Sequence, residues 1–373
     1  MRVTSEEELA EVIRGATTPH WLQGGGTRGM GLGRGGTLLD LTGLSGITLY
    51  EPGALTLVAR AGTALAEVDA VLAAEGQRLA CEPGCWSGLL GTAGVGTIGG
   101  TIGGAVAANV AGPRRVQVGA LRDALLGVRF VDGTGALIKN GGRVMKNVTG
   151  YDLVKLMAGS FGTLGVLTEV SLKVLPMPEA VATLILADIG LADAVAAMAV
   201  ALGSPYDVSG AARLPDAALL IRVEGFEGSV AYRARQLTDL LKRYGEVAIE
   251  RDAARNAALW QKVRDVEPFH GLAGDVWRFS VKASDAAGVS QRLGGSTLLD
   301  WGGGLIWALL PEGSDGRALA SPYRGHATIV RAGAELRRRL SVFEPEAAAV
   351  AALTAGLRAS FDPKGILNPG LMD

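Results

Sequence analysis

Over the first 90 residues, segments whose hydrophobic residues have helical spacing alternate with short segments typical of strands. A helix is predicted from the capping box of Ser5 and Glu8, because Leu9, Val12 and Ile13 then form one apolar stripe that stops near Gly15. Strands are predicted at residues 21–22, 38–41 and 55–60, and a second helix runs from residue 63 to residue 76. These elements predict a compact α/β lobe over residues 1–90.

A second lobe is predicted over residues 91–176. Two strands, at residues 125–131 and 136–139, are separated by Asp132-Gly133-Thr134-Gly135, which is a strong hairpin signal. A helix near residues 151–158 and a strand at residues 167–174 complete this lobe. The first 176 residues therefore predict one domain built from two lobes.

Pro176-Met177-Pro178 predicts a domain boundary, because two prolines force extended backbone and end the preceding strand. Strands then alternate with helices over residues 177–340, which predicts an α+β domain with one antiparallel sheet and helices on one face. The predicted strands lie at residues 181–186, 219–223, 276–281, 305–310 and 327–330, and the predicted helices at residues 191–202, 230–244 and 253–266. A last helix, at residues 345–360, belongs to a C-terminal segment at residues 341–373.

Four glycine-rich loops interrupt the N-terminal domain, at residues 24–29, 97–104, 146–153 and 158–167. The second runs into small residues that can start a helix, so its backbone N–H groups and the helix N-terminus predict an anion seat. For that run alone, tight structural packing is the alternative. Four such loops exceed what ordinary turns require, which favours binding of a phosphate-containing ligand.

The composition limits the classes of ligand and the cellular location that we expect for this protein. Glycine accounts for 55 of the 373 residues, and 36 basic residues against 37 acidic ones give a formal charge of −1, so no basic surface for nucleic acid is indicated. The start has no signal-peptide pattern and no apolar run reaches the ~20 residues that span a bilayer, so we expect a cytoplasmic protein. Cys81 and Cys85 are interpreted as buried thiols, with a redox pair as the alternative.

In their order, the four loops resemble the FAD-binding domain of the vanillyl-alcohol oxidase / p-cresol methylhydroxylase (PCMH) flavoprotein superfamily. The resemblance covers residues 1–176 and returns at residues 361–370. It implies an α+β fold in which a two-lobed FAD-binding domain is followed by a cap domain at residues 177–340. It also implies that the dinucleotide lies between the lobes and that the C-terminal segment returns to the flavin.

Within this superfamily, the chain resembles the FAD-binding E subunits of glycolate oxidases. The matching segments are Gly112-Pro113-Arg114-Arg115, Lys146-Asn147-Val148-Thr149-Gly150-Tyr151-Asp152, Val276-Trp277-Arg278-Phe279-Ser280, Asp300-Trp301-Gly302-Gly303 and Gly325-His326-Ala327-Thr328. This resemblance implies a FAD-binding subunit that takes part in oxidation of glycolate to glyoxylate and passes electrons to partner subunits.

The resemblance also assigns residues to the cofactor. Those implied at the pyrophosphate are Gln23, Gly24, Gly25, Gly26, Thr27, Arg28, Thr101, Ile102, Gly103 and Gly104. Asn109 is implied beside the flavin or ribityl chain, Asn368 near the isoalloxazine, and Gly159, Gly165 and Val166 on the adenine-ribose side. The first loop has no histidine of the kind that attaches flavin covalently in some members, so FAD is expected to be bound non-covalently.

Candidate catalytic residues come from the cap domain. If this chain oxidises a small 2-hydroxy acid itself, a cation must bind the carboxylate and a base must take the hydroxyl proton. Arg278 is the candidate for the first role and His326 for the second. A structural salt bridge and a structural histidine are the alternatives. The three histidines are widely separated, so no metal site is predicted.

The sequence and the resemblance leave three functions to consider. The favoured one is a FAD-carrying subunit that works with a larger catalytic FAD subunit and an iron–sulfur subunit, which could hold it at the inner face of a membrane. The first alternative is a FAD-dependent 2-hydroxy-acid dehydrogenase acting alone. The second is an NADPH-dependent reductase of cell-wall precursor synthesis, for whose serine and glutamate motif the sequence offers no match.

Overall fold

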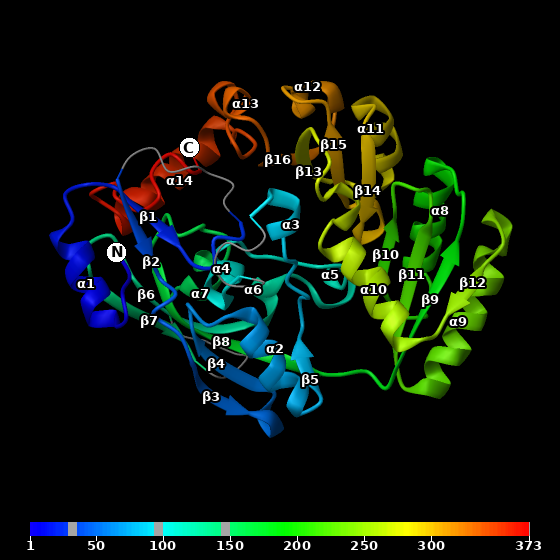
Figure 1. The fold of residues 1–373 in the computed structure, drawn as a ribbon, viewed down its shortest axis with the longest axis horizontal. Helices are drawn as coiled ribbons and strands as arrows, with labels where there is room; N and C mark the ends of the chain where they lie inside the picture. Colours follow the sequence, from blue (N-terminus) through cyan, green and yellow to red (C-terminus); the bar gives the residue numbers. More distant parts are fainter. Residues whose placement is uncertain (29–35, 93–99, 143–149, 373) are drawn as a thin grey trace.

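The computed structural model describes residues 1–28, 36–92, 100–142 and 150–372. The chain forms a two-stranded sheet, a six-stranded sheet and an eight-stranded sheet, of which the first two belong to the N-terminal domain (Figure 1). The described strands are β1 His20–Gln23, β2 Thr37–Asp40, β3 Ile47–Glu51, β4 Thr56–Arg60, β5 Gln77–Leu79, β6 Leu125–Val131, β7 Leu137–Gly141, β8 Val166–Pro176, β9 Ala180–Leu186, β10 Val208–Arg213, β11 Leu219–Gly225, β12 Ala248–Glu250, β13 Asp275–Val281, β14 Ser296–Asp300, β15 Leu305–Leu310 and β16 Gly325–Arg331.

The first helix, α1 (Glu6–Gly15), begins as the sequence predicts but closes differently. The Ser5 hydroxyl accepts from the Glu8 N–H at 3.1 Å, whereas the Glu8 carboxylate accepts from the Thr4 N–H instead of that of Ser5. Thr4 offers both its amide and its hydroxyl to this carboxylate, so it captures the side chain. The apolar stripe of α1 packs on the parallel pair β1–β2 and on Leu367 from the far end of the chain.

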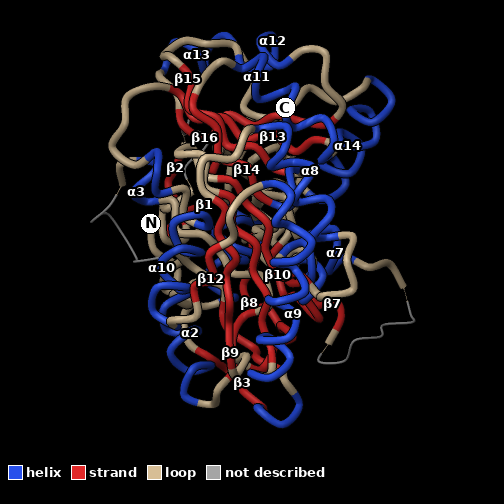
Figure 2. The backbone as a smooth tube through the Cα atoms, turned by 90° about the vertical axis from the view of Figure 1, so that its right-hand side faces the viewer, coloured by secondary structure: helices blue, strands red, loops and turns tan. Residues whose placement is uncertain are grey.

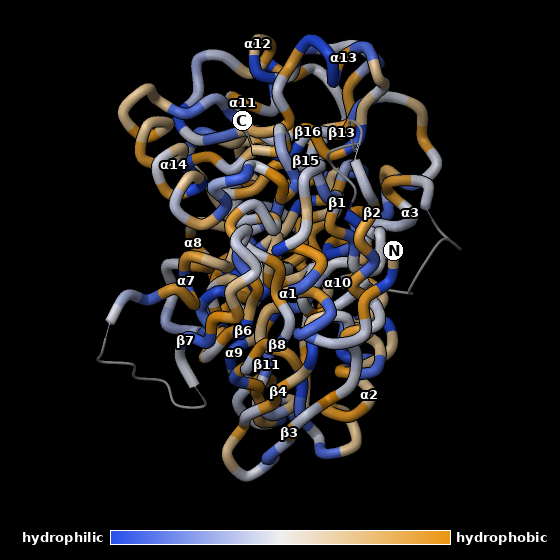
Figure 3. Tube along the Cα trace, turned by 90° about the vertical axis from the view of Figure 1, so that its left-hand side faces the viewer, coloured by the Kyte–Doolittle hydropathy of each residue, from blue (hydrophilic) through white to orange (hydrophobic). Residues whose placement is uncertain are grey.

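The six-stranded sheet crosses the boundary expected near residue 90. Strand β8 pairs with β4 on one side and β6 on the other, in the order β3-β4-β8-β6-β7, and β5 also pairs with β8. Hydrophobic residues are concentrated along β4, β6 and β8 (Figure 3). The helices of this domain after α1 are α2 Leu65–Ala74, α3 Ser87–Leu90, α4 Ile102–Ala107, α5 Arg115–Val118, α6 Leu121–Ala124 and α7 Leu153–Met157.

The eight-stranded sheet is antiparallel, in the order β12-β9-β11-β10-β14-β15-β13-β16. The prediction that its helices lie on one face was wrong. Helices α8 (Leu191–Leu202), α9 (Glu227–Leu241) and α11 (Ala286–Leu293) cover one face, whereas α10 (Ala253–Arg264) packs Trp260 and Val263 on the other (Figure 2). The Trp260 indole N–H donates to the Thr183 hydroxyl at 2.8 Å, which fixes α10 on that face.

The C-terminal segment runs back to the N-terminal domain. Helices α12 (Gly316–Ala320), α13 (Ala334–Arg339) and α14 (Ala348–Phe361) lead into a tail whose Lys364 ammonium donates to the main-chain oxygens of Ile13 and Arg14. Leu367 then pairs with His20 beside β1. The last residues of the chain thus lie against the first strand.

A buried ionic seam joins the two domains. The seam consists of Arg78, Glu82 and Arg114 of the N-terminal domain together with Arg222 and Glu224 of β11. Arg222 holds both oxygens of Glu82 at 2.9 and 3.0 Å, and Glu224 lies 2.7 Å from Arg78 and 3.4 Å from Arg114. Each guanidinium of the seam therefore has a carboxylate partner from the opposite domain.

Candidate functional site

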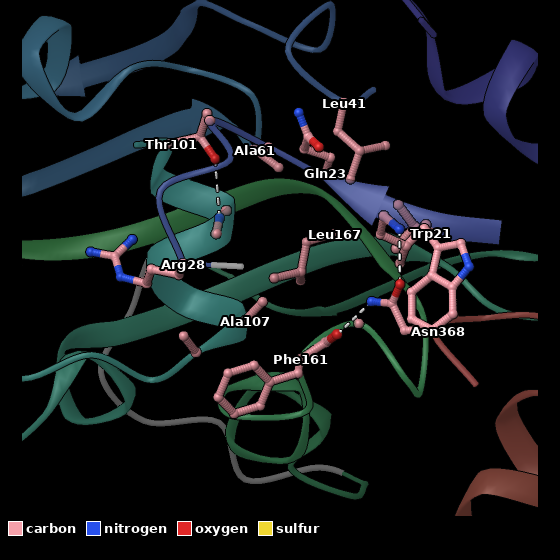
Figure 4. Close-up of a pocket in the computed structure, with 18 of the residues that line it drawn as sticks. Trp21, Gln23, Arg28, Leu41, Ala61, Thr101, Ala107, Phe161, Leu167 and Asn368 are labelled. Atoms are coloured by element: carbon pink, nitrogen blue, oxygen red, sulfur yellow. Dashed lines mark hydrogen bonds between the residues drawn. The ribbon is translucent and has the colours of Figure 1, made fainter. Parts of the chain in front are cut away.

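A cavity of about 490 Å³ lies inside the N-terminal domain, a size typical of small-molecule sites (Figure 4). Segments from five parts of the chain surround it, and one of them is the C-terminal tail. Its described lining residues are Trp21, Leu22, Gln23, Gly24, Gly25, Gly26, Thr27, Arg28, Gly36, Leu38, Leu41, Ala61, Thr101, Gly103, Gly104, Ala107, Ala108, Phe161, Gly162, Gly165, Val166, Leu167, Asn368 and Leu371.

One wall is the glycine loop that follows β1, residues 24–28. The main-chain N–H groups of residues 24–27 donate no hydrogen bond to any described residue. Gly25 and Thr27 are buried, whereas Gly26 is exposed. Buried N–H groups are nearly always paired in folded proteins, so those of Gly25 and Thr27, in a loop that lines the cavity, indicate an acceptor that a ligand brings. This loop can therefore hold an anion by its backbone.

Arg28 is the only charged residue among the described lining residues. One of its N–H groups donates to the Gly84 main-chain oxygen at 2.5 Å and its guanidinium lies 5.6 Å from the centre of the Trp86 ring. Its Nε is buried and has no described partner, and burial lowers the pKa of Arg28 to about 10. The cavity thus presents one cation with an unused donor and no described carboxylate.

The opposite wall behaves differently from the predicted anion seat. At the start of α4, the N–H of Ile102 donates to Thr63, that of Gly103 to Ala61, and that of Gly104 to the Thr101 hydroxyl. Those donors are used within the fold, so the first turn of α4 contributes shape instead of free amides. Gly103 is required there because a Cβ would lie 2.7 Å from the Ala61 main-chain oxygen.

Gly24 brings the two walls together. A Cβ at this position would lie 2.4 Å from the Thr101 hydroxyl oxygen, so a larger residue would push the glycine loop away from α4. The distance between the loop and the helix, and with it the width of the cavity, depends on the absence of this side chain.

Asn368 lines the cavity but its side-chain amide is occupied. Its Oδ1 accepts from the Leu22 N–H at 2.8 Å, and its Nδ2 donates to the Phe161 main-chain oxygen at 2.8 Å (Figure 4). The residue has φ +45°, a left-handed conformation that asparagine tolerates better than most residues. Asn368 therefore ties the tail to two walls of the cavity.

Three residues implied at the cofactor do not line the cavity. Ile102 is fully buried in the core. The side-chain oxygen of Asn109 accepts from the Arg122 N–H at 2.9 Å, and Gly159 packs against Asn109. The predicted loop residues 97–99 and 146–149 lie outside the described residues.

Sequence reasoning missed most of the apolar lining. Trp21, Leu41, Ala61, Phe161 and Leu167 add apolar surface around the cavity, which suits a flat ring system (Figure 4). Trp21 and Leu22 belong to a strand that the sequence does predict, and strand alternation could have directed attention to their exposed face. Phe161 and Leu167 lie in the glycine-rich stretch at residues 158–167, whereas nothing local marks Ala61, because tertiary packing alone brings it to the cavity.

Arg278 and His326 are not among the residues that line the cavity. They lie on the neighbouring strands β13 and β16, where Arg278 pairs with Thr328 and Ser280 with His326. Burial and the nearby charge of Arg115 lower the pKa of Arg278 to about 10. Desolvation and the charge of Arg278 lower the pKa of His326 below its ordinary value, which favours its neutral form.

The described part of the chain lacks two further kinds of feature. No group of three or more histidine, cysteine or acidic residues there is arranged to hold a metal ion. No helix among these residues combines the length and the hydrophobicity needed to cross a membrane.

Comparisons with known proteins point to the kind of ligand that the cavity suits. A family model described as FAD binding domain matches residues 1–141. Glycolate oxidase subunit GlcE of Escherichia coli is 39% identical over 359 residues, which cover 95% of this chain and 93% of that protein. Glycolate oxidase subunit GlcD of Bacillus subtilis is 44% identical over 85 residues, covering 23% of this chain and 18% of that protein.

Among solved structures, alkyldihydroxyacetonephosphate synthase superposes with a TM-score of 0.70 at 17% identity, over 99% of this chain and 76% of that one. At this identity the likeness concerns the fold alone. Together the comparisons confirm the predicted flavoprotein resemblance and the α+β fold class.

Proposed function

Because the chain belongs to the family of glycolate oxidase subunit GlcE, we propose that it is the FAD-binding subunit of a glycolate oxidase complex. In this role it takes part in oxidation of glycolate to glyoxylate, and electrons pass through its flavin to partner subunits. The observation that carries the proposal is the sequence identity with GlcE over nearly the whole of both chains. The cavity supports it, because its hydrogen-bond donors without a described acceptor suit an anion.

The residues of the cavity suit FAD. The N–H groups of residues 24–27 and the unused Nε of Arg28 would bind the pyrophosphate, opposite Thr101, Gly103 and Gly104. The apolar side with Trp21 and Phe161 would take the ring system, while Gly165 and Val166 lie farther along the same cavity. When bound, FAD supplies a ring that accepts a hydride equivalent.

We further propose that the flavin is held without a covalent bond. The described lining contains no histidine, cysteine or tyrosine that could attach to the ring. Retention then depends on the glycine loop, on Arg28 and on the apolar side. Acid denaturation should release all the flavin from the purified protein.

The partners in this proposal are a larger catalytic FAD subunit and an iron–sulfur subunit. It places the complex in the cytoplasm or at the inner face of the membrane. The names of the two glycolate oxidase relatives, each called a subunit, support an assembly of several chains. The position of Arg278 and His326 outside the cavity lining also favours oxidation of glycolate on a partner.

A second candidate is a 2-hydroxy-acid dehydrogenase that acts without partners. It is favoured by one observation, the partly buried Arg278 guanidinium, which has no described hydrogen bond or ion pair. In this alternative Arg278 binds the substrate carboxylate and His326, kept neutral by its lowered pKa, takes the hydroxyl proton.

One experiment separates the candidates. The tagged full-length chain is purified alone and with co-expressed partners, its flavin is identified after acid release, and glycolate is added under anaerobic conditions. We expect a yellow protein that releases FAD, that glycolate does not bleach when alone, and that is bleached in the assembled complex. Bleaching of the isolated chain would support the second candidate, and a colourless protein that takes up no FAD would contradict both.

A further inference from the structure

Three ionisable side chains near the domain boundary have no polar partner in the described structure. Arg115 lies on α5 of the N-terminal domain, and Arg278 and His326 lie on β13 and β16 of the second domain. None of them makes a hydrogen bond or ion pair with a described residue. Arg278 is partly buried, so its unpaired charge costs more than that of an exposed arginine.

Trp301 holds the two arginines beside one another. The Arg115 guanidinium lies 4.7 Å from the centre of the Trp301 ring and that of Arg278 lies 5.2 Å from it. Arg278 also lies 6.0 Å from the Trp307 ring. Two like charges are therefore gathered on one indole, although their mutual repulsion opposes this arrangement.

Trp301 is fixed in an unusual conformation. Its φ of +54° is rare for a bulky residue, and its backbone N–H donates to the Asp300 carboxylate while its indole N–H donates to the Gly112 main-chain oxygen at 3.0 Å. Strained residues of this kind occur preferentially at functional sites. The indole N–H thus ties the ring of Trp301, a residue of the second domain, to the N-terminal domain.

The neighbouring acids do not neutralise the two arginines. The described bond of Asp300 goes to the Trp301 N–H, and burial raises the pKa of Asp300 to about 7. Glu344 accepts from the Tyr323 hydroxyl, from Arg317 and from the Ala327 N–H. Neither carboxylate makes an ion pair with Arg115 or Arg278 among the described residues.

The seam supplies a comparison within the same molecule. Arg222 also lies over an indole, 4.4 Å from the centre of the Trp260 ring, but it forms two hydrogen bonds to Glu82. Arg331, another structural arginine, instead donates to main-chain oxygens such as those of Leu89 and Leu272. Arg278 has the same kind of ring contact as Arg222 but neither a carboxylate nor a main-chain acceptor among the described residues, which indicates that a ligand supplies its acceptor.

We propose that Arg115, Arg278 and Trp301 form a binding site for a small organic carboxylate, located at the boundary between the two domains. The two guanidinium groups would donate to the carboxylate oxygens, while the indole keeps both groups in place. His326, at the rim, would contact a hydroxyl or a second carboxylate. This inference rests on the proposed function only in the choice of glycolate as the probe ligand.

The test uses the FAD-loaded full chain and measures glycolate binding by calorimetry, with tryptophan fluorescence as a second readout. Glycolamide, which has the shape of glycolate without its charge, is the control ligand. The variants are Arg278→Gln and Arg115→Gln, and Arg338→Gln is the matched control because Arg338 is exposed and has no described partner. Circular dichroism and flavin content of each variant establish folding and FAD loading separately from glycolate binding.

We expect wild type and Arg338→Gln to bind glycolate equally, and each of the other two variants to bind it about tenfold more weakly or worse, since a charge-assisted bond is lost. Glycolamide should not bind. Equal binding of glycolate by all variants, equal binding of glycolamide, or no binding to the folded, FAD-loaded wild type would overturn the proposal. Because FAD content is measured first, failure of the cofactor assignment appears as loss of flavin and is not confused with failure of this site.

Discussion

The cavity and the seam handle polar groups in opposite ways. In the cavity, four consecutive N–H groups and the Nε of Arg28 have no described partner, and no carboxylate lines the wall. In the seam, every guanidinium has a carboxylate from the other domain, although Arg78 Nε and two nitrogens of Arg114 also lack a described hydrogen bond. A run of unused main-chain donors beside a cavity therefore marks a place suited to a ligand, whereas guanidinium–carboxylate pairs hold the domains together.

The same criterion changes the interpretation of α4. Its glycine-rich start is the strongest phosphate signal in the sequence, yet the N–H groups of its first turn, residues 102–104, are used by Ala61, Thr63 and Thr101. The N–H groups of Gly100 and Thr101, just before the helix, have no described acceptor, as is also the case for residues 24–27. The free donors therefore come from the two loops and not from the helix start.

The largest effect should follow from breaking the seam. Glu224→Gln leaves Arg78 and Arg114 buried without their counter-ion, and we expect the free energy of unfolding in urea to fall by about 3–5 kcal/mol. Asp239→Asn, which breaks the exposed pair with Lys242, is the control and should cost less than about 1 kcal/mol. Equal effects would show that the seam does not join the domains.

The pH dependence of the same carboxylate follows from its surroundings. Burial alone would raise the pKa of Glu224, but the guanidinium groups of Arg222, Arg114 and Arg78 lower it to about 2. A carboxylate with a lowered pKa stabilises the fold above its ordinary value of 4.5, and the stabilisation is lost as the pH falls toward 2. Glu224→Gln should therefore flatten the acid limb of the stability profile.

The next effect concerns the cavity. Arg28→Gln removes the one cation of the described lining, and we expect FAD to bind tenfold to about a hundredfold more weakly, because a charge-assisted hydrogen bond contributes about 1.5–3 kcal/mol. Arg251→Gln, at an exposed arginine of the second domain, is the control and should leave the affinity unchanged. Titration of FAD into flavin-free protein measures both. If Arg28→Gln bound FAD with unchanged affinity, the Arg28 guanidinium would not contribute to FAD binding.

A smaller effect is expected at the tail. Asn368→Ala removes the bonds to Leu22 and Phe161 and should lower the free energy of unfolding by about 2 kcal/mol, with faster proteolysis of the tail. Asn368→Gly keeps the left-handed backbone favourable and should be slightly less destabilised. If both variants matched wild type, the tail would not be held by this side chain.

The last effect tests a carboxylate that the seam does not pair. Burial raises the pKa of Asp300 to about 7, so the folded protein retains its proton longer than the unfolded chain and stability falls as the pH rises from about 4 to 7. Asp300→Asn should therefore have a higher free energy of unfolding than wild type near pH 8 and the same free energy of unfolding near pH 4. A gain that grew toward low pH would reverse the assignment.

Much of the fold is readable from the sequence because local signals agree with packing. Helix α8 has the predicted bounds, and the Asp132–Gly135 turn joins β6 to β7 as its chemistry predicts. Strand β10 is missed because Val208-Ser209-Gly210-Ala211-Ala212-Arg213 lacks bulky β-branched alternation. Its place is set by pairing with β11 and by the Trp260 ring, which leaves no room for a Cβ at Gly210.

The candidate site is predictable only in part, for a physical reason. Glycine runs announce a close backbone approach, so the loop at residues 24–28 could be found. Whether an N–H group is free depends on acceptors far away in the chain, such as Ala61 and Thr63 for α4. The unpaired state of Arg278 likewise depends on where Asp300 and Glu344 direct their oxygens.

Hydrogen exchange of individual amides with and without FAD tests the central claim most directly. The account predicts that the amides of residues 24–27 exchange fast in flavin-free protein and slow markedly when FAD binds. Those of residues 102–104 should be slow in both states, because they are already bonded within the fold. Protection that appears at residues 102–104 and not at 24–27 would contradict it.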